Sequence, residues 1–130
     1  MSQMYILPGE PISMTRLRIG RSSKIWDASK QTEFNARNTL DNQHRPNNHI
    51  DYAIVLSVSF FFKPVRRLFN NTRALTGPHL NNPDLIDLIN FIETMGTGVL
   101  WIHPRLITSI NARKLYHDDP HTEIEIIRAL

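Results

Sequence analysis

One segment, His79–Ile107, constrains the fold of this chain more than any other. Apolar residues recur in it at spacings of three and four over Asp84–Met95, which places them along one side of a helix. Asp84 suits the N-cap of such a helix, Asp87 suits the positive end of its dipole, and Gly96 stands where a C-cap glycine belongs. We therefore expect an amphipathic helix that begins at Asp84 and buries one side against a core.

Strand patterns occur on both sides of this helix. The strongest is Tyr52–Phe62, where Ile54, Leu56, Val58 and Phe60 are expected to face the core and the alternate set includes two serines. The other expected elements are strands at Met4–Leu7, Gly98–Ile102, Leu106–Tyr116 and Thr122–Ile127, and a second helix over Lys30–Leu40. Irregular or loop structure is expected at Glu10–Ser29, Asp41–Asp51 and Lys63–Asn82. This order predicts an α+β fold with a mixed sheet and about two helices on one face.

Length and composition limit the class of protein. A chain of 130 residues predicts one domain, residues 1–130. The absence of cysteine excludes disulfides, thiolate zinc sites and thiol nucleophiles. The start of the chain lacks the pattern of a signal peptide, and the longest apolar run is shorter than the roughly 20 residues of a membrane span. We therefore expect a cytoplasmic protein.

Basic residues are concentrated in two segments. The net charge is +3 and the pI is about 9.6. Arg16–Lys30 has five basic residues against one acid, and Lys63–Arg73 has four against none. Two such segments in a small domain suit contact with the phosphates of a nucleic acid, and the alternative is a solvated surface with uneven charge.

Few side chains could form a catalytic or metal site. Asp84 and Asp87 lie three apart at the predicted helix start, and His103 follows the next predicted strand. Mg²⁺ prefers clustered oxygen ligands, so these three would suit Zn²⁺ or Mn²⁺ better. In the alternative interpretation both acids stabilise the helix start and His103 begins a turn. The cluster at His117–His121 is expected to be a turn between strands, although its residues also resemble ligands.

Taken together, these segments resemble the RusA-type Holliday-junction resolvases, which are small homodimeric, Mg²⁺-dependent endonucleases. The opening YILPGEPISMTRLR is similar to the family's apolar strand, Pro-Gly turn and basic stretch, and KIWDASK is similar to its aromatic and Lys segment. HLNNPDLIDLINFI parallels the family's His, Pro-Asp and helix. GVLWIHPRLITSINARKLY parallels its Gly, paired Asp and following strand, and HTEIEIIRAL is similar to its last strand. The resemblance covers nearly the whole chain and implies a RusA-like fold.

The chain departs from the family at the positions that the resemblance makes catalytic. Asp84 stands at the first family Asp. The other positions differ: Ile86 stands at the second Asp, Asp87 at the Asn after it, Asn90 at the helix Lys, and His103 and Pro104 at the paired Asp. In such enzymes clustered acids hold Mg²⁺, which activates water and stabilises the transition state of phosphoryl transfer. Loss of these ligands puts cleavage by this chain in doubt.

The resemblance therefore implies a homodimer that binds branched DNA in recombination and repair. Its catalytic residues would be Asp84 and Asp87, and its metal, Mg²⁺ if any, would be held by Asp84, Asp87 and His103. The residues expected to contact DNA are Arg16, Arg18, Arg21, Lys24, Arg66, Arg67 and Lys114. Three alternatives stay open: an active junction nuclease, a homologue that keeps only DNA binding, and a protein-interaction module that has reused the fold.

Overall fold

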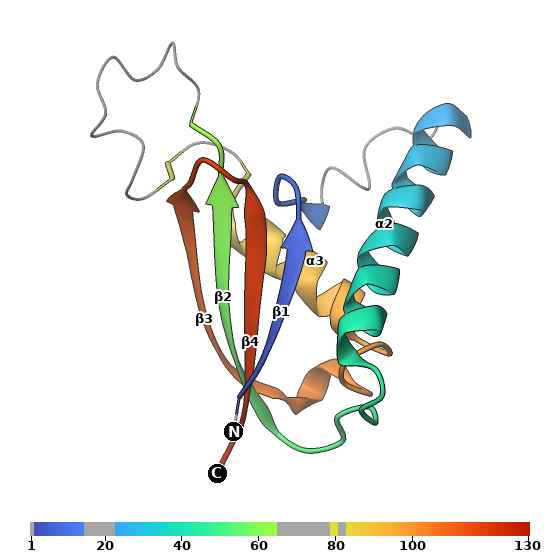
Figure 1. Ribbon diagram of the computed structural model, residues 1–130, viewed down its shortest axis with the longest axis vertical. Helices are drawn as coiled ribbons and strands as arrows, with labels where there is room; N and C mark the ends of the chain where they lie inside the picture. Colours follow the sequence, from blue (N-terminus) through green and yellow to red (C-terminus); the bar gives the residue numbers. More distant parts are fainter. Residues whose placement is uncertain (1, 15–22, 65–78, 81–82) are drawn as a thin grey trace.

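The computed structural model describes residues 2–14, 23–64, 79–80 and 83–130, with the backbone alone for 23–29. Its elements in chain order are β1 (Ser2–Pro8), α2 (Ser23–His44), β2 (Ile54–Phe62), α3 (Leu85–Gly96), the 3₁₀ helix η3 (Pro104–Leu106), β3 (Ile107–Tyr116) and β4 (His121–Arg128). Figure 1 shows these elements with the sequence running from blue to red.

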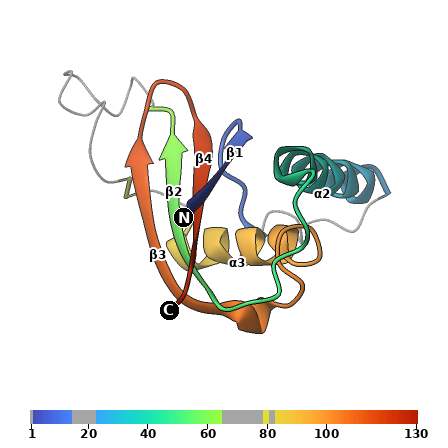
Figure 2. The ribbon, with the colours of Figure 1, turned by 60° about the horizontal axis from the view of Figure 1, so that its bottom comes forward.

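The strands form one mixed sheet in the order β1-β4-β2-β3. The pairs β1-β4 and β2-β4 are antiparallel, whereas β2 and β3 are parallel. Parallel neighbours need a crossover connection, and α3 lies within that connection. In the rotated view α3 lies across one face of the sheet, with α2 beyond β1 (Figure 2). This arrangement confirms the expected α+β fold with two helices on one face of a mixed sheet.

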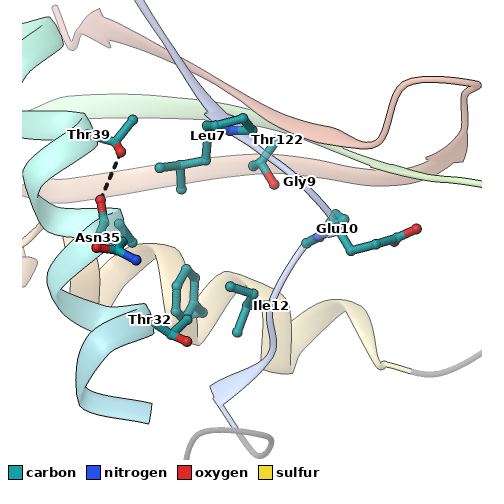
Figure 3. A pocket seen from close by; sticks show the side chains of 12 residues that line it. Leu7, Gly9, Glu10, Ile12, Thr32, Asn35, Thr39 and Thr122 are labelled. Atoms are coloured by element: carbon teal, nitrogen blue, oxygen red, sulfur yellow. Dashed lines mark hydrogen bonds between the residues drawn. The ribbon is translucent and has the colours of Figure 1, made fainter. Parts of the chain in front are cut away.

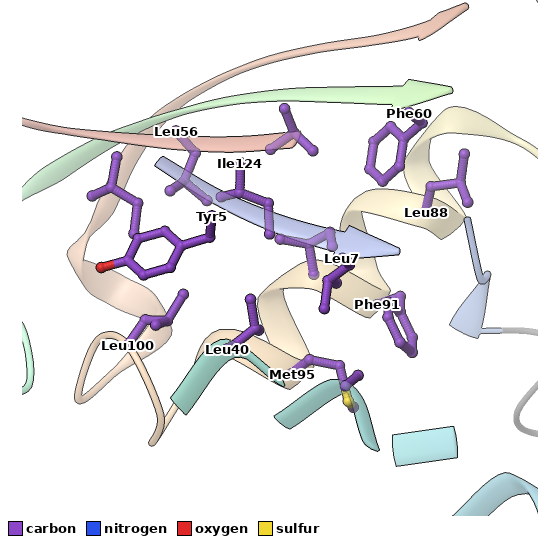
Figure 4. Close-up of a cluster of buried hydrophobic side chains, with 14 of the residues drawn as sticks. Tyr5, Leu7, Leu40, Leu56, Phe60, Leu88, Phe91, Met95, Leu100 and Ile124 are labelled. Carbon is purple, nitrogen blue, oxygen red and sulfur yellow. The ribbon is translucent and has the colours of Figure 1, made fainter. Parts of the chain in front are cut away.

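The core lies between that face and the two helices. The four residues of β2 that were expected to face inward, Ile54, Leu56, Val58 and Phe60, are all buried. They pack with the buried stripe of α3, which consists of Leu88, Phe91, Ile92 and Met95, and with residues of β1, β4 and α2 (Figure 4). The helical and strand periodicities therefore meet in one hydrophobic cluster, which sets the position of α3 on the sheet.

Helix α2 is longer than the expected Lys30–Leu40 at both ends, and it includes residues 23–29 and 41–44, which were expected to be irregular. Tertiary contacts hold its last turn. The Gln43 side chain accepts the N–H of Ile6 at 2.8 Å and donates to the Ile6 carbonyl at 2.6 Å, so it closes the outer edge of β1. Earlier in the helix, the Arg37 guanidinium donates to the carbonyls of Thr94 and Thr97 at the end of α3. These partners are remote in the chain, so local periodicity did not reveal them.

The expected strand Gly98–Ile102 was wrong. The chain instead folds back over the end of α3, where the N–H groups of Leu100 and Trp101 donate to the Gly96 carbonyl at 2.8 and 3.3 Å. The positive φ falls at Gly98, at +85°, and not at Gly96. A Cβ on Gly96 would lie 2.2 Å from the Trp101 ring. Gly96 is therefore required for close packing of the tryptophan, a role that a sequence pattern does not distinguish from a C-cap.

Candidate functional site

Three segments meet at the edge of the sheet where the parallel strands β2 and β3 end. Lys114 lies near the end of β3, paired with Phe60 of β2. Its Nζ donates to the carbonyl oxygen of Pro83 at 2.7 Å, and its own carbonyl accepts the backbone N–H of His79 at 3.0 Å. Pro83 directly precedes Asp84, the N-cap residue of α3. The fold thus brings a lysine ammonium to the start of the helix that the sequence marked as the candidate site.

Charges at this place influence one another. Burial lowers the pKa of Lys114, and the negative charge of Asp84 acts in the opposite direction. Burial also lowers the pKa of His79, and the positive charge of Lys114 adds to that effect. His79 is therefore neutral at neutral pH, and the cationic side chain of Lys114 acts on it. We call these three residues, His79, Asp84 and Lys114, the helix-start cluster.

His79 is the member of this cluster that sequence reasoning did not select as a site residue. Its side chain is only 8% exposed, stacked on the Phe62 ring with 3.9 Å between centroids and tilted against Tyr116 at 5.0 Å. Within the part of the chain that the structure describes, its Nδ1 is buried without a hydrogen-bond partner. Such an unsatisfied buried polar atom is uncommon in native proteins. The His before Pro-Asp in HLNNPD was the available signal.

The two predicted catalytic acids both lie at the start of α3. Asp84 has extended backbone angles, and its side chain makes no capping hydrogen bond. Asp87 lies in the first turn, where its charge suits the helix dipole. Ile86, between them, is 73% exposed and offers no ligand atom. Asp84 and Asp87 are thus positioned on one short segment, as the sequence indicated.

His103 lies just before the start of β3, at the end of this strand that is opposite Lys114. It is the N-cap of η3, and its Nδ1 accepts the backbone N–H of Arg105 at 3.0 Å. The strand between Ile107 and Lys114 alone spans about 23 Å at the usual rise per residue. The structure therefore does not bring His103 to Asp84 and Asp87 within one chain. Among the described residues, no three His, Asp or Glu side chains form a group that could hold a metal ion. Two carboxylates beside an ammonium do not fit the oxygen-rich donor set that Mg²⁺ prefers.

The other predicted contacts with DNA are mostly beyond what the structure describes. Arg16, Arg18, Arg21, Arg66 and Arg67 lie outside the described residues, as does the side chain of Lys24. Lys114 is described and belongs to the helix-start cluster. The segment His117–His121 connects β3 to β4, as expected of a turn. There the His121 ring stacks on Phe61 with 4.6 Å between centroids, and its Nε2 lies 3.3 Å from a Glu123 oxygen.

A cavity of about 220 Å³ lies apart from the cluster, between the end of β1 and the two helices (Figure 3). Its walls combine apolar side chains such as Leu7 and Phe91 with the hydroxyls of Thr32 and Thr39. Glu10 is the acid on its rim, and its Oε1 accepts the N–H of Lys63 at 3.2 Å. Glu10 is the one titratable side chain among the described residues that line the cavity, so chemistry is better sought at the helix-start cluster.

Comparison with protein families agrees with the geometry. The family model described as Endodeoxyribonuclease RusA matches residues 8–127, nearly the whole chain. The chain belongs to the RusA endodeoxyribonuclease family, and this membership supports a function like that of the Holliday-junction resolvases. A search of curated proteins found no match. Across the described residues, none of the helices combines the length and the apolar character needed to cross a membrane.

The buried imidazole predicts acid sensitivity. The pKa of His79 is lowered in the folded state, so below about pH 6.5 the unfolded chain takes up a proton that the folded chain resists. The free energy of unfolding is therefore greatest above the pKa that His79 has in the unfolded chain. It falls as the pH drops toward the lower pKa that His79 has in the folded chain. His79→Phe, which keeps the stack on Phe62, should flatten this decline in urea titrations between pH 7 and 5. His49→Phe, at an exposed position, should leave it unchanged; equal slopes in all three proteins would contradict the assignment.

Proposed function

We propose that this protein binds four-way DNA junctions as a cytoplasmic homodimer in recombination and repair, with little or no cleavage. The observation that carries the proposal is the helix-start cluster of a RusA-family chain. At the start of α3 the family's first acid, Asp84, is kept, and Lys114 is beside it. The second acid position holds the exposed Ile86. The residues that would contact DNA are retained better than the residues that would hold a metal.

Binding is supported by charge and by symmetry. The net charge is +3, and the basic residues fall in two segments of the chain. The logarithm of affinity falls linearly with the logarithm of salt concentration. Each phosphate that the protein neutralises makes the slope of that line steeper by about one unit. A two-fold dimer would present two equal surfaces, which suits the symmetry of a four-way junction. These properties favour a protein whose affinity for junctions is high at low salt and falls as salt rises.

The side chains available as metal ligands support the proposal that cleavage is weak. The described residues at the helix start provide Asp84 and Asp87, with the Lys114 ammonium hydrogen-bonded to Pro83. Replacing a ligand by an aliphatic or amide side chain removes transition-state stabilisation, and each tenfold loss in rate corresponds to about 1.4 kcal/mol. With several family ligands replaced, we expect the rate of junction cleavage to fall by many orders of magnitude.

The binding test compares a synthetic four-way junction with a linear duplex of the same sequence over a range of salt. Arg66→Ala with Arg67→Ala should lower junction affinity by roughly tenfold or more and reduce the salt slope by about two. The matched control is Arg45→Ala with Arg105→Ala, which removes the same number of positive charges at two exposed positions and should change little. Sedimentation equilibrium should show a dimer. Affinity that is equally weak for both DNAs, or independent of salt, would reject junction binding.

The cleavage test uses the same junction with Mg²⁺ or Mn²⁺. We expect no product above background, and no difference between the natural chain and Asp84→Asn. Cleavage that Asp84→Asn abolishes would instead establish an active nuclease and reject the proposed loss of activity.

A protein-interaction module is the second candidate. It is favoured by two large apolar side chains close to the cluster, Leu80 at 89% and Ile86 at 73% exposed. Exposed apolar side chains contribute to protein-binding surfaces where they form a contiguous patch. In that case partners recovered with the purified chain would persist after nuclease treatment and be lost in Leu80→Ser with Ile86→Ser. Partners that disappear with nuclease treatment would favour the DNA-binding function.

A further inference from the structure

We propose that the cavity between the end of β1 and the two helices binds an uncharged heteroaromatic ring of the size of a pyrimidine base. Two sources supply such a ring: a free base or nucleoside, and a base extruded from a DNA junction. Only the second source rests on the proposed function. The binding site itself stands on the walls, the polar groups and the charge of the cavity.

The size and the walls of the cavity suit a small ring. The cavity has a volume of about 220 Å³. An apolar cavity of about 150 Å³ is already large enough to bind benzene, so there is room here for a ring with substituents. The walls include three buried apolar side chains, Leu7 of β1, Ala36 of α2 and Phe91 of α3, and the partly buried Ile12 (Figure 3). These walls favour a flat ligand that is largely apolar.

A buried hydroxyl group in the cavity lacks a partner. Thr122 lies on β4 opposite Leu7 and is only 3% exposed. Its side chain points into the cavity (Figure 3), and its hydroxyl makes no hydrogen bond within the part of the chain that the structure describes. A buried polar group without a partner is costly, because it has given up its hydrogen bonds to water. A ligand atom that bonds to this hydroxyl would offset that cost.

A second polar group, the side-chain amide of Asn35, lies on the wall formed by α2. Its oxygen accepts from the Gln31 side chain at 2.9 Å, and the Asn35 backbone carbonyl accepts the Thr39 hydroxyl at 2.8 Å (Figure 3). The amide nitrogen makes no hydrogen bond to any described residue. An amide nitrogen can only donate, so it suits a carbonyl oxygen of the ligand.

The charge of the cavity disfavours anions. Neither lysine nor arginine is among the described residues that line it. Its one acid, Glu10, extends away from the cavity toward the end of β2 (Figure 3), where it accepts the N–H of Lys63. A phosphate would therefore meet no cation here, and an anionic ligand would lose its hydration without compensation. The ligand that suits these walls is uncharged.

A pyrimidine base combines these properties. It is a flat, uncharged ring whose carbonyl oxygens accept hydrogen bonds, as the Asn35 nitrogen requires, and the Thr122 hydroxyl can either donate or accept. In DNA the bases are the parts that carry no charge, and extrusion of a base costs least where it is unpaired or poorly stacked. The crossover of a four-way junction is such a place, so an extruded base is the DNA group that fits this cavity.

The experiment titrates the full chain with thymine and follows the methyl signals of Leu7, Ile12 and Thr122 by NMR. We expect saturable shifts with a Kd at or below about 1 mM, the range usual for a ligand of this size. Orotate, a pyrimidine of similar size that carries a carboxylate, should bind at least roughly tenfold more weakly.

Two variants test the polar groups of the cavity. Asn35→Ala removes the amide at an exposed helix position, and Thr122→Val removes the hydroxyl while keeping the shape of the side chain. Each should weaken thymine binding by about fivefold, the usual effect of one lost hydrogen bond. Asn38→Ala is the matched control, because Asn38 is also exposed on α2 and does not line the cavity. Its affinity for thymine should equal that of the natural chain.

A second titration, with a synthetic four-way junction, distinguishes the two sources of the ring. Shifts of the Leu7 and Ile12 methyl signals that match those caused by thymine would assign the site to an extruded base. A junction that binds without moving these signals would assign the site to a free base or nucleoside. The inference is overturned if thymine causes no saturable shift, if both variants bind it as tightly as the natural chain, or if orotate binds equally well. A chain that binds no junction would reject the proposed function, whereas the thymine titration would still decide the role of the cavity.

Discussion

Gly96→Ala is expected to destabilise the protein by about 3 kcal/mol, at the upper end of the usual cost of overpacking. The new Cβ would lie 2.2, 2.5 and 2.8 Å from three carbons of the Trp101 ring. That ring is fully buried, so it has no room to move away. Its Nε1 also donates to the Thr97 hydroxyl at 2.9 Å, which fixes its orientation. The free energy of unfolding, measured by urea denaturation, should fall with little change in the m-value.

Gly98→Ala is the matched control for this prediction. Gly98 has a φ of +85°, and a Cβ there would meet nothing within 4 Å. Its replacement should cost only the backbone strain of the left-handed region, about 1 kcal/mol. A loss in Gly96→Ala no greater than the loss in Gly98→Ala would show that the Trp101 ring does not pack against the end of α3 as described.

His44→Ala should also lower stability by about 3 kcal/mol, because it leaves a cavity and removes two hydrogen bonds. His44, in the last turn of α2, is 2% exposed. Its Nε2 lies 2.9 Å from the Asn48 carbonyl oxygen and its Nδ1 lies 2.6 Å from the Tyr5 hydroxyl. A carbonyl can only accept, so Nε2 carries the proton. The Tyr5 hydroxyl can then donate to Nδ1, and it also lies 3.0 Å from the Gln3 side-chain oxygen. Burial, with a smaller contribution from Tyr52, raises the pKa of Tyr5 to about 12, which keeps this donor protonated.

A substitution of Tyr5, the hydrogen-bond partner of His44, separates the energetic effect of the hydrogen bond from that of the cavity. Tyr5→Phe removes the hydroxyl and keeps the ring, and a double-mutant cycle with His44→Ala should give a coupling of about 1 kcal/mol or more. His49→Ala, five residues along the chain and exposed, should change the free energy of unfolding by no more than about 0.5 kcal/mol. Equal effects of His44→Ala and His49→Ala in urea titrations would contradict the buried network.

The candidate site could be predicted from the sequence only in part. Asp84 and Asp87 were identified because helix-start signals are local, and those signals place both acids on one turn. Lys114 was identified as a contact for DNA because of its charge, and not as a neighbour of Asp84. Its hydrogen bond to Pro83 joins residues 31 apart in the chain, and no periodicity encodes such a pair. His103 was grouped with the acids because it follows the helix, but α3 carries the chain away from Asp84, and β3 returns to the helix start only after His103.

The sequence by itself determined the strand that the structure places at Ile54–Phe62, the helix after Asp84, the α+β class and the resemblance to the RusA family. Alternation and helical spacing could be recognised because they act over a few residues. The tertiary structure decided three other features: the length of α2, the turn over the end of α3, and the pairing of Lys114 with the start of that helix. Each of these depends on a contact with a distant segment, namely Gln43 with β1, Trp101 with Gly96, and Lys114 with Pro83. Hydrogen bonds and close packing between remote segments form only when the sheet and helices have come together, so the surroundings of Asp84 depend on the folded chain.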